Sequence, residues 1–197
     1  MKPTETGRLY DRIASWWDSR EGESTAGVRF VRAAVGHCAN KGNALDVGCG
    51  SGGRIIDALL DAGFRVTGID VSGAMLGYAR RRHPGARFIA GDICEWGPAD
   101  RYDLIVAWDS IFHVPHAEQR RVVAKLCDAL AGGGVLLFTA GGVDGEITGR
   151  MQGEEFYYSS LAEDEYLRTL KGRGCKCVLM ERDQHPEDHV VFIAVKS

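Results

Sequence analysis

The stretch Ala44-Leu-Asp-Val-Gly-Cys-Gly-Ser-Gly-Gly53 joins a short apolar run to an acid and a glycine-rich turn. An apolar run that meets closely spaced glycines and continues with helical periodicity is typical of a strand, a turn and a helix in an α/β sheet. Glycines let the chain turn sharply and let a ligand approach the backbone. The spacing of Gly48, Gly50 and Gly53 fits G-x-G-x-x-G, which favours nucleotide-type binding over a simple tight turn without identifying the cofactor.

Short apolar runs alternate with helical stretches on both sides of this turn, which predicts a mostly parallel sheet with helices on both faces. The expected strands are 43–47, 65–69, 87–90, 102–107 and 134–139, and the expected helices between them are 53–62, 72–82 and 116–130. Two last strand-like runs, 175–183 and 189–196, have no helix between them and must be antiparallel neighbours. We therefore predict a single α/β, Rossmann-like domain. Its sheet is seven-stranded and mostly parallel, with one antiparallel strand near the C-terminal edge.

The remaining segments are assigned around this core. We expect a single domain over 1–197, divided into four parts: an N-terminal helical cover (1–38), a cofactor-binding core (43–139), a substrate lid or loop (140–160), and a helix with a closing β-hairpin (161–197). The glycine-rich stretch 140–159 is long for a connector, and such loops are often lids. Its aromatic residues 156–158 either line a substrate site or belong to the hydrophobic core.

Composition limits the function classes. The chain has 197 residues, 45% of them hydrophobic, and a formal net charge of -3, which argues against a large nucleic-acid surface. No apolar run approaches the roughly 20 residues of a membrane span. The N-terminus is polar, so we expect a cytoplasmic protein. The basic run 80–82 fits a helix end. The six cysteines, including the pair Cys175 and Cys177, are expected in the core rather than in disulfides or a metal site.

Acids lie at the ends of three successive predicted strands. Asp46 is near the end of the first strand, Asp70 ends the second and Asp92 follows the third. The carboxyl ends of parallel strands form the ligand crevice of an open α/β sheet. There Asp70 can accept hydrogen bonds from both ribose hydroxyls of a nucleoside, and Asp92 can accept one from an adenine amino group. Each acid alone could be a solvated loop residue, but three together favour a nucleotide site.

These motifs resemble those of the class I S-adenosylmethionine-dependent methyltransferases, over roughly residues 40–140. LDVGCGSG is similar to the first motif of that family, VTGIDVSGAML to the second, FIAGDI to the third and YDLIVAWDSIFHV to the fourth. The resemblance implies S-adenosyl-L-methionine as the cofactor. The cofactor-binding residues that it implies in these motifs are Asp46, Gly48, Cys49, Gly50, Asp70, Val71, Met75, Asp92, Ile93 and Trp108.

The N-terminal cover supplies further candidates. In similar small-molecule methyltransferases an N-terminal helix covers the cofactor, which implies that Tyr10, Trp17 and Arg20 reach it. Arg20 would then pair with the cofactor's carboxylate. The alternative is a packing helix with a surface arginine.

His113, after the fourth strand, is the candidate catalytic residue. An imidazole with an ordinary pKa near 6.5 suits proton transfer at neutral pH. A positioning or packing role is the alternative, and in the family a histidine at this place is frequently structural. Asp109 either orients His113, contacts substrate or caps the following turn. His185 and His189, with Asp183 and Asp188, fit exposed hairpin residues better than a metal site, so no metal is predicted.

The expected function is methyl transfer to a small organic acceptor through an O, N, S or C nucleophile. RNA or protein methylation and cofactor binding without transfer are the alternatives. A dehydrogenase would share the glycine spacing, but usually lacks the acid two residues before the first glycine. We expect a small-molecule substrate, no nucleic-acid or membrane partner, and a monomer or homodimer. The acceptor itself cannot be read from these residues.

Overall fold

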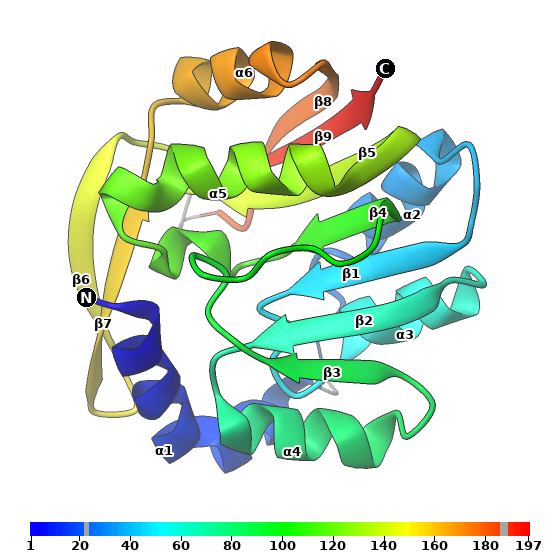
Figure 1. Cartoon of the computed structure of the whole chain (residues 1–197). Helices are drawn as coiled ribbons and strands as arrows, with labels where there is room; N and C mark the ends of the chain where they lie inside the picture. The colour runs from blue at the N-terminus through cyan, green and yellow to red at the C-terminus, as the bar shows by residue number, and fades with distance from the viewer. Residues whose placement is uncertain (22–23, 186–188) are drawn as a thin grey trace.

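The computed structural model describes residues 1–21, 24–185 and 189–197. Its main sheet has seven strands in the order β3-β2-β1-β4-β5-β9-β8 (Figure 1). Only β9 in this sheet runs against its neighbours, pairing antiparallel with both β5 and β8. The predicted fold class is therefore confirmed. The strands are β1 (Asn43–Val47), β2 (Arg65–Asp70), β3 (Arg87–Ala90), β4 (Tyr102–Ala107), β5 (Leu130–Ala140), β8 (Cys175–Asp183) and β9 (His189–Lys196).

Helices cover both faces of this sheet. One apolar cluster joins α5 and α6 to one face, through Val122 and Leu170. The other joins α2 and α3 to the opposite face, through Phe30 and Ile56. The helices are α1 (Pro3–Glu21), α2 (Val28–His37), α3 (Arg54–Asp61), α4 (Gly73–Arg82), α5 (His116–Ala129), α6 (Glu163–Gly172) and the short 3₁₀ helix η1 (Ile111–His113). Among the described helices none is long and apolar enough to cross a membrane.

The central strands are apolar on both faces because helices cover both. Four consecutive residues of β4, from 104 to 107, are buried, as expected for a parallel strand between two helical layers. β5 begins at Leu130, four residues before the predicted start, because Leu130 pairs with Tyr102 across an irregularity in the ladder.

The N-terminal helix α1 lies over the carboxyl edge of the sheet and is fixed to α4. Ser72 caps α4 by accepting a 3.1 Å hydrogen bond from the Met75 amide. Asp11 of α1 accepts hydrogen bonds from the Ser72 hydroxyl (2.6 Å) and the Ala74 amide (3.0 Å). A Cβ atom on Gly7 would lie 2.9 Å from the Val71 carbonyl oxygen, so glycine allows α1 to approach this closely. The cover predicted over 1–38 thus includes a docked helix.

The stretch 140–159 is not the loop that we expected. It contains the strands β6 (Gly145–Met151) and β7 (Glu154–Ser160), which form an antiparallel hairpin beside α1 (Figure 1). Gln152 and Gly153 join them with positive φ angles of 51° and 81°, the signature of a two-residue hairpin turn. The sequence lacks the alternation of apolar and polar residues that predicts a strand, because β6 is largely exposed and has no apolar face.

Candidate active site

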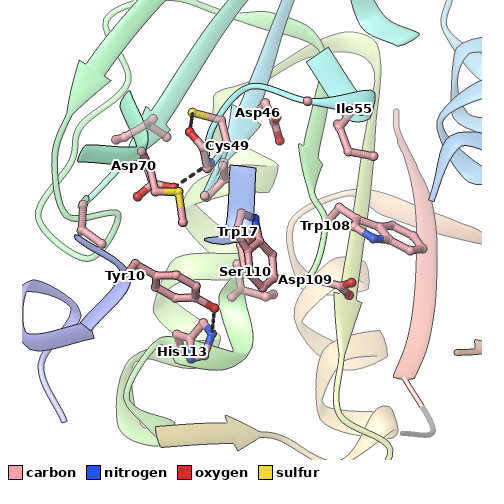
Figure 2. A pocket seen from close by; sticks show the side chains of 18 of the residues that line it. Tyr10, Trp17, Asp46, Cys49, Ile55, Asp70, Trp108, Asp109, Ser110 and His113 are labelled. Carbon is pink, nitrogen blue, oxygen red and sulfur yellow. Dashed lines mark hydrogen bonds between the residues drawn. The ribbon is translucent and has the colours of Figure 1, made fainter. Parts of the chain in front are cut away.

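A cavity of about 550 Å³ lies at the carboxyl ends of β1, β2 and β4, beneath α1 (Figure 2). Its walls contain His113 and all the predicted cofactor-binding residues except Asp92. The structure thus brings together residues from α1, the glycine-rich turn, the end of β2 and the segment after β4. These residues are Tyr10, Trp17, Arg20, Asp46, Gly48, Cys49, Gly50, Asp70, Val71, Met75, Ile93 and Trp108.

The glycine-rich turn is built for a close approach. Gly48 has a positive φ of 70°, and a Cβ atom there would lie 2.3 Å from the Ser110 Cβ. A Cβ atom on Gly50 would meet only the Trp17 indole nitrogen, at 3.8 Å. Gly48 therefore lets the segment after β4 pack against the turn. Gly50 leaves open space on the cavity side, where a ligand can reach the backbone.

Asp70 ties the end of β2 to this turn. Its Oδ2 accepts a hydrogen bond from the Gly50 amide and its Oδ1 accepts one from the Ser72 amide, each at 2.8 Å. Burial raises the pKa of Asp70, while these backbone amides counteract the rise by stabilising the charged form. Each carboxylate oxygen can accept further hydrogen bonds, as contact with two ribose hydroxyls would require.

Asp92, unlike the other predicted cofactor-binding residues, is not among those that line the cavity. Its Oδ1 accepts a 2.8 Å hydrogen bond from the Cys94 amide, so the side chain caps the turn after β3. Its neighbours Gly91 and Ile93 line the cavity instead.

Tyr10 and His113 form a hydrogen-bonded pair between α1 and η1. The Tyr10 hydroxyl lies 2.9 Å from His113 Nε2, and His113 Nδ1 lies 2.8 Å from the Tyr157 carbonyl oxygen. Because a carbonyl can only accept, Nδ1 carries the proton, and Nε2 of a neutral ring accepts from Tyr10. Burial lowers the pKa of His113 to about 4, which keeps the ring neutral at physiological pH.

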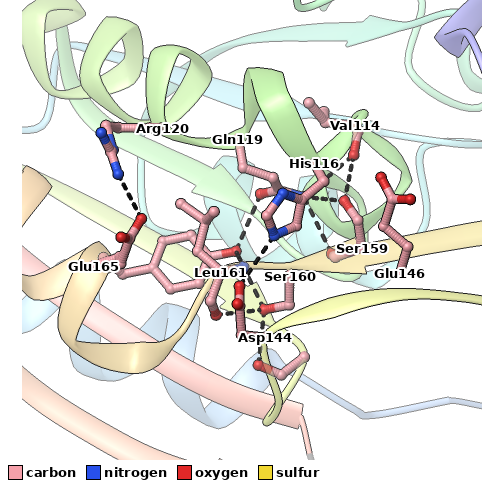
Figure 3. A network of polar contacts seen from close by, with 12 residues as sticks. Val114, His116, Gln119, Arg120, Asp144, Glu146, Ser159, Ser160, Leu161 and Glu165 are labelled. Atoms are coloured by element: carbon pink, nitrogen blue, oxygen red, sulfur yellow. Dashed lines mark hydrogen bonds and ion pairs between the residues drawn. The ribbon is translucent and has the colours of Figure 1, made fainter.

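A buried polar network holds the segment that carries His113 (Figure 3). The Gln119 amide nitrogen donates to the carbonyl oxygens of Ile111 (2.8 Å) and Ser159 (3.1 Å), and the Gln119 amide oxygen accepts from the Tyr166 hydroxyl (3.1 Å). Gln119 itself is fully buried. One side chain of α5 thus fixes η1 and β7 relative to each other.

Asp109 is another predicted residue at the cavity, and it adopts a left-handed conformation with φ of 48°. Its carboxylate accepts hydrogen bonds from the Thr139 hydroxyl (3.1 Å) and the Gln184 amide (3.0 Å), and it pairs with His189 Nδ1 (3.0 Å). It therefore does not contact His113 through a hydrogen bond among the described residues. Nor does it cap η1, since the residue before that helix is Ser110 and makes no side-chain capping bond.

Asp183 and His189 are neighbours across the β8–β9 ladder, but their side chains have other partners. His189 pairs with Asp109, and Asp183 pairs with Arg29 at 2.9 Å. Asp188 lies outside the described residues. Within the described part of the chain no group of three or more His, Cys, Asp or Glu side chains could hold a metal ion, and the six cysteines are free thiols.

Three residues of the cavity wall have a buried polar side-chain atom with no hydrogen-bond partner in the described structure. These atoms are the Thr6 hydroxyl oxygen, the Trp108 indole nitrogen and the Ser110 hydroxyl oxygen. Buried polar groups are nearly always hydrogen-bonded, so these atoms are suited to contact a bound polar molecule. Together with the open backbone at Gly50 and the Asp70 carboxylate, they fit a nucleoside attached to a polar chain.

Several lining residues escaped the sequence-based prediction. Arg54, Ser110 and Gln184 line the cavity, and so does Trp16, over which the Arg20 guanidinium lies at 5.2 Å. Ser110 lies within the fourth motif, whereas Trp16, Arg54 and Gln184 lie outside the four motifs. By contrast, the aromatic residues 156–158 are not among the lining residues. Phe156 is fully buried against Tyr10, with 4.8 Å between ring centroids, so it supports the wall from behind.

Comparisons with known proteins agree with this geometry. Residues 44–134 match the family model described as "Methyltransferase domain". The chain is 39% identical over 131 residues to a trans-aconitate 2-methyltransferase from Acidovorax sp. (strain JS42), and 43% identical over 95 residues to one from Paracidovorax citrulli. The matches cover 65% and 47% of this chain, but only 49% and 36% of those relatives.

Solved structures share the fold over almost the whole chain. Magnesium protoporphyrin IX methyltransferase from Synechocystis, with bound SAH, superimposes with a TM-score of 0.75 at 17% identity, covering 98% of this chain and 99% of that one. The 1,6-didemethyltoxoflavin-N1-methyltransferase from Burkholderia thailandensis gives a TM-score of 0.72 at 22% identity, covering 100% and 91%. The architecture of those proteins is therefore reproduced in this chain.

Proposed function

We propose that this chain is a class I S-adenosylmethionine-dependent methyltransferase and that it transfers a methyl group from that cofactor to a small organic acceptor. The observation that carries the proposal is the cavity, in which the glycine-rich turn, Asp70 and the helical cover meet. A formal net charge of -3 supports a small acceptor over RNA. The names of the relatives and of the proteins with solved structures also support a small-molecule acceptor.

The residues present fit the cofactor. Asp70 would bind the ribose hydroxyls, Val71 and Ile93 would pack on the adenine, and the turn at Gly48 to Gly50 would lie along the methionine part. Trp108, whose indole nitrogen lacks a protein partner in the described structure, can donate a hydrogen bond to that part. When bound, the cofactor supplies a methyl group activated by a positively charged sulfur.

The task left to the chain is to place the attacking atom in line with this methyl group and to exclude water. α1 closes the cavity through Tyr10 and Trp17, whose rings meet edge to face with centroids 5.7 Å apart. These rings supply an apolar wall beside the open backbone at Gly50. The acceptor would therefore react in a partly dry space between α1 and the end of β4.

The geometry supports a positioning role for His113 over proton transfer. A ring whose pKa is about 4 takes up little proton at neutral pH and is a weak base. Its Nε2 instead accepts the Tyr10 hydroxyl hydrogen bond and thereby fixes the orientation of Tyr10 in the wall. Substituting His113 should reduce turnover much more than cofactor affinity.

Calorimetry tests the cofactor half of the proposal. The protein should bind S-adenosylhomocysteine and should not bind NAD. Asp70→Ala should weaken S-adenosylhomocysteine binding about tenfold or more, because it removes the ribose acceptor. Asp92→Ala should have a smaller effect on affinity, since Asp92 does not line the cavity. Binding of NAD alone would contradict the proposal.

Turnover tests the transfer half. The protein, incubated with methyl-labelled cofactor and a metabolite extract, should release S-adenosylhomocysteine and yield a small product heavier by one methylene group. His113→Gln should lower this turnover while leaving S-adenosylhomocysteine affinity within about threefold. Cofactor binding with no labelled product in any extract would instead support a binding protein without transfer activity.

A further inference from the structure

Asp109 is held in an unusual backbone conformation beside the cavity. A φ of 48° lies in the left-handed region, which residues with side chains adopt at a cost. The conformation is maintained by Thr139, a fully buried residue of β5 whose hydroxyl oxygen accepts a 2.7 Å hydrogen bond from the Asp109 amide. Strained residues of this kind cluster at functional sites, where neighbouring groups hold them in place.

The hydrogen bonds of Asp109 leave one of its oxygens with spare capacity. Oδ1 interacts with three side chains: the Thr139 hydroxyl, the Gln184 amide and His189 Nδ1. Oδ2 receives only the Gln184 amide, at 3.0 Å, among the contacts described. A carboxylate offers about four acceptor positions, so Oδ2 can accept another donor. The side chain is 21% exposed, and the residue lines the cavity.

Tyr10 also presents a hydrogen-bond acceptor oxygen to the cavity. Its hydroxyl proton is engaged by His113 Nε2, because His113 Nδ1 donates to the Tyr157 carbonyl. The Tyr10 oxygen can therefore only accept a hydrogen bond from a ligand. Figure 2 shows the Tyr10 and His113 pair on one side of the cavity and Asp109 on another. Side chains from α1 and from the end of β4 thus both offer hydrogen-bond acceptor atoms to a bound molecule.

The charged residues around the cavity also favour a molecule that donates hydrogen bonds over one that carries several carboxylates. Its described lining contains three acids, Asp46, Asp70 and Asp109, and the cations Arg20 and Arg54. The Arg54 guanidinium already donates to the Ala26 carbonyl oxygen at 2.6 Å. Arg20 is the residue expected to pair with the cofactor's own carboxylate. Acids thus outnumber arginines in the described lining, which disfavours a molecule with several carboxylates.

We propose that Asp109 determines acceptor specificity, by accepting a hydrogen bond from an N–H or O–H group of a neutral or cationic acceptor and by repelling polycarboxylates. The inference rests on the proposed methyl transfer and names its substrate class: phenols, amines and related donor-bearing molecules. It separates this chain from the activity printed in the names of its curated relatives, because trans-aconitate carries three carboxylates and no N–H or alcohol O–H group.

The test uses the full chain, methyl-labelled cofactor and three acceptor sets: phenols, aromatic amines, and trans-aconitate with other polycarboxylates. The wild-type protein should methylate members of the first two sets and not the third. Asp109→Asn should raise the KM for the best acceptor about tenfold or more, with S-adenosylhomocysteine affinity changed less than about threefold. The exposed Asp61→Asn, which removes the same charge outside the cavity, should leave both values unchanged.

The outcomes separate this inference from the proposed function. Methylation of polycarboxylates in preference to phenols and amines would overturn the role of Asp109 while upholding methyl transfer, and so would an unchanged KM in a folded Asp109→Asn protein. Failure of the wild type to bind S-adenosylhomocysteine would refute the proposed function itself. Should Asp109→Asn fail to fold, the acceptor preference of the wild-type protein still decides the question.

Discussion

At the scale of single residues, the burial of His113 makes the stability of the protein depend on pH. The ring is 8% exposed, and burial lowers its pKa to about 4, whereas the unfolded chain titrates near 6.5. Between these values the unfolded state binds more protons than the folded state. The free energy of unfolding therefore rises with pH across this window and falls as the solution is acidified.

We expect His113→Gln to flatten this pH dependence. Between pH 6.5 and 4 the wild-type protein should lose stability from this ring, up to about 3 kcal/mol, whereas the variant should lose less. Urea unfolding at several pH values measures the difference. His37→Gln, at an exposed site on α2, is the control and should leave the wild-type slope unchanged. If the unfolding free energies of the wild type and of His113→Gln changed equally with pH, the lowered pKa of His113 would be contradicted.

At the scale of elements, the docking of α1 depends on one glycine. Gly7 approaches the Val71 carbonyl so closely that a Cβ atom would lie 2.9 Å from its oxygen. Gly77 lies within α4, and a Cβ atom there would meet only the Arg81 guanidinium, at 3.6 Å. Replacing glycine by alanine favours any helix by about 1 kcal/mol, so the two sites separate helix propensity from close packing.

The prediction is that Gly77→Ala stabilises the protein by about 0.5–1 kcal/mol and leaves S-adenosylhomocysteine affinity unchanged. Gly7→Ala should lack this gain and should weaken the same binding about threefold or more, because α1 is displaced from the cavity. Thermal unfolding and calorimetry measure the two effects. Equal stabilisation by both substitutions, with equal affinity, would show that α1 has room to accommodate a side chain.

The hydrogen bonds of Gln119 lead to a second prediction at this scale, about stability. Gln119→Leu would leave buried carbonyl groups of η1 and β7 without a donor, which should cost about 2–4 kcal/mol of stability. Arg120→Gln, one residue further along α5, breaks only the exposed ion pair with Glu165 and should cost less than about 1 kcal/mol. Urea unfolding compares the two variants, and similar losses would refute the importance of the network.

The sequence predicted those elements whose apolar pattern matches their burial. β1 was expected at 43–47 and β4 at 102–107, and both have these bounds, because their residues are buried between two helical layers. The hairpin β6–β7 was missed because its outer strand is exposed and its turn is Gln152-Gly153 rather than Asn-Gly. Gln184 was missed as a cavity residue because tertiary folding alone brings it to Asp109.

At the scale of the whole molecule, the cover over the cavity is assembled from distant segments. Arg12 of α1 binds Glu154 at the start of β7 through two hydrogen bonds of 2.6 Å. Tyr10 packs on Phe156 of the same strand. The cover helix and the hairpin are therefore joined to each other as well as to the sheet. We expect them to respond together when the cavity is filled.

Hydrogen–deuterium exchange tests this expectation. Saturating S-adenosylhomocysteine should slow exchange in α1, in the turn 48–53 and in β7, and should leave α6 unchanged. In Glu154→Gln the protection of α1 should persist while that of β7 diminishes, because the link to Arg12 is weakened. The matched substitution Glu163→Gln, which affects an exposed ion pair with Arg182, should retain the wild-type pattern. Protection confined to the turn would contradict a coupled cover.

The single reversed strand has a consequence for how proteins with this fold could diversify. Because β9 runs against the others, its first residue, His189, lies at the same sheet edge as Asp109. The segment between β8 and β9 can therefore change in length or composition while the glycine-rich turn and Asp70 keep their positions. Surface connections tolerate such insertions at little thermodynamic cost. Under the proposed function, acceptor choice can thus change in this segment while the glycine-rich turn and Asp70 are preserved.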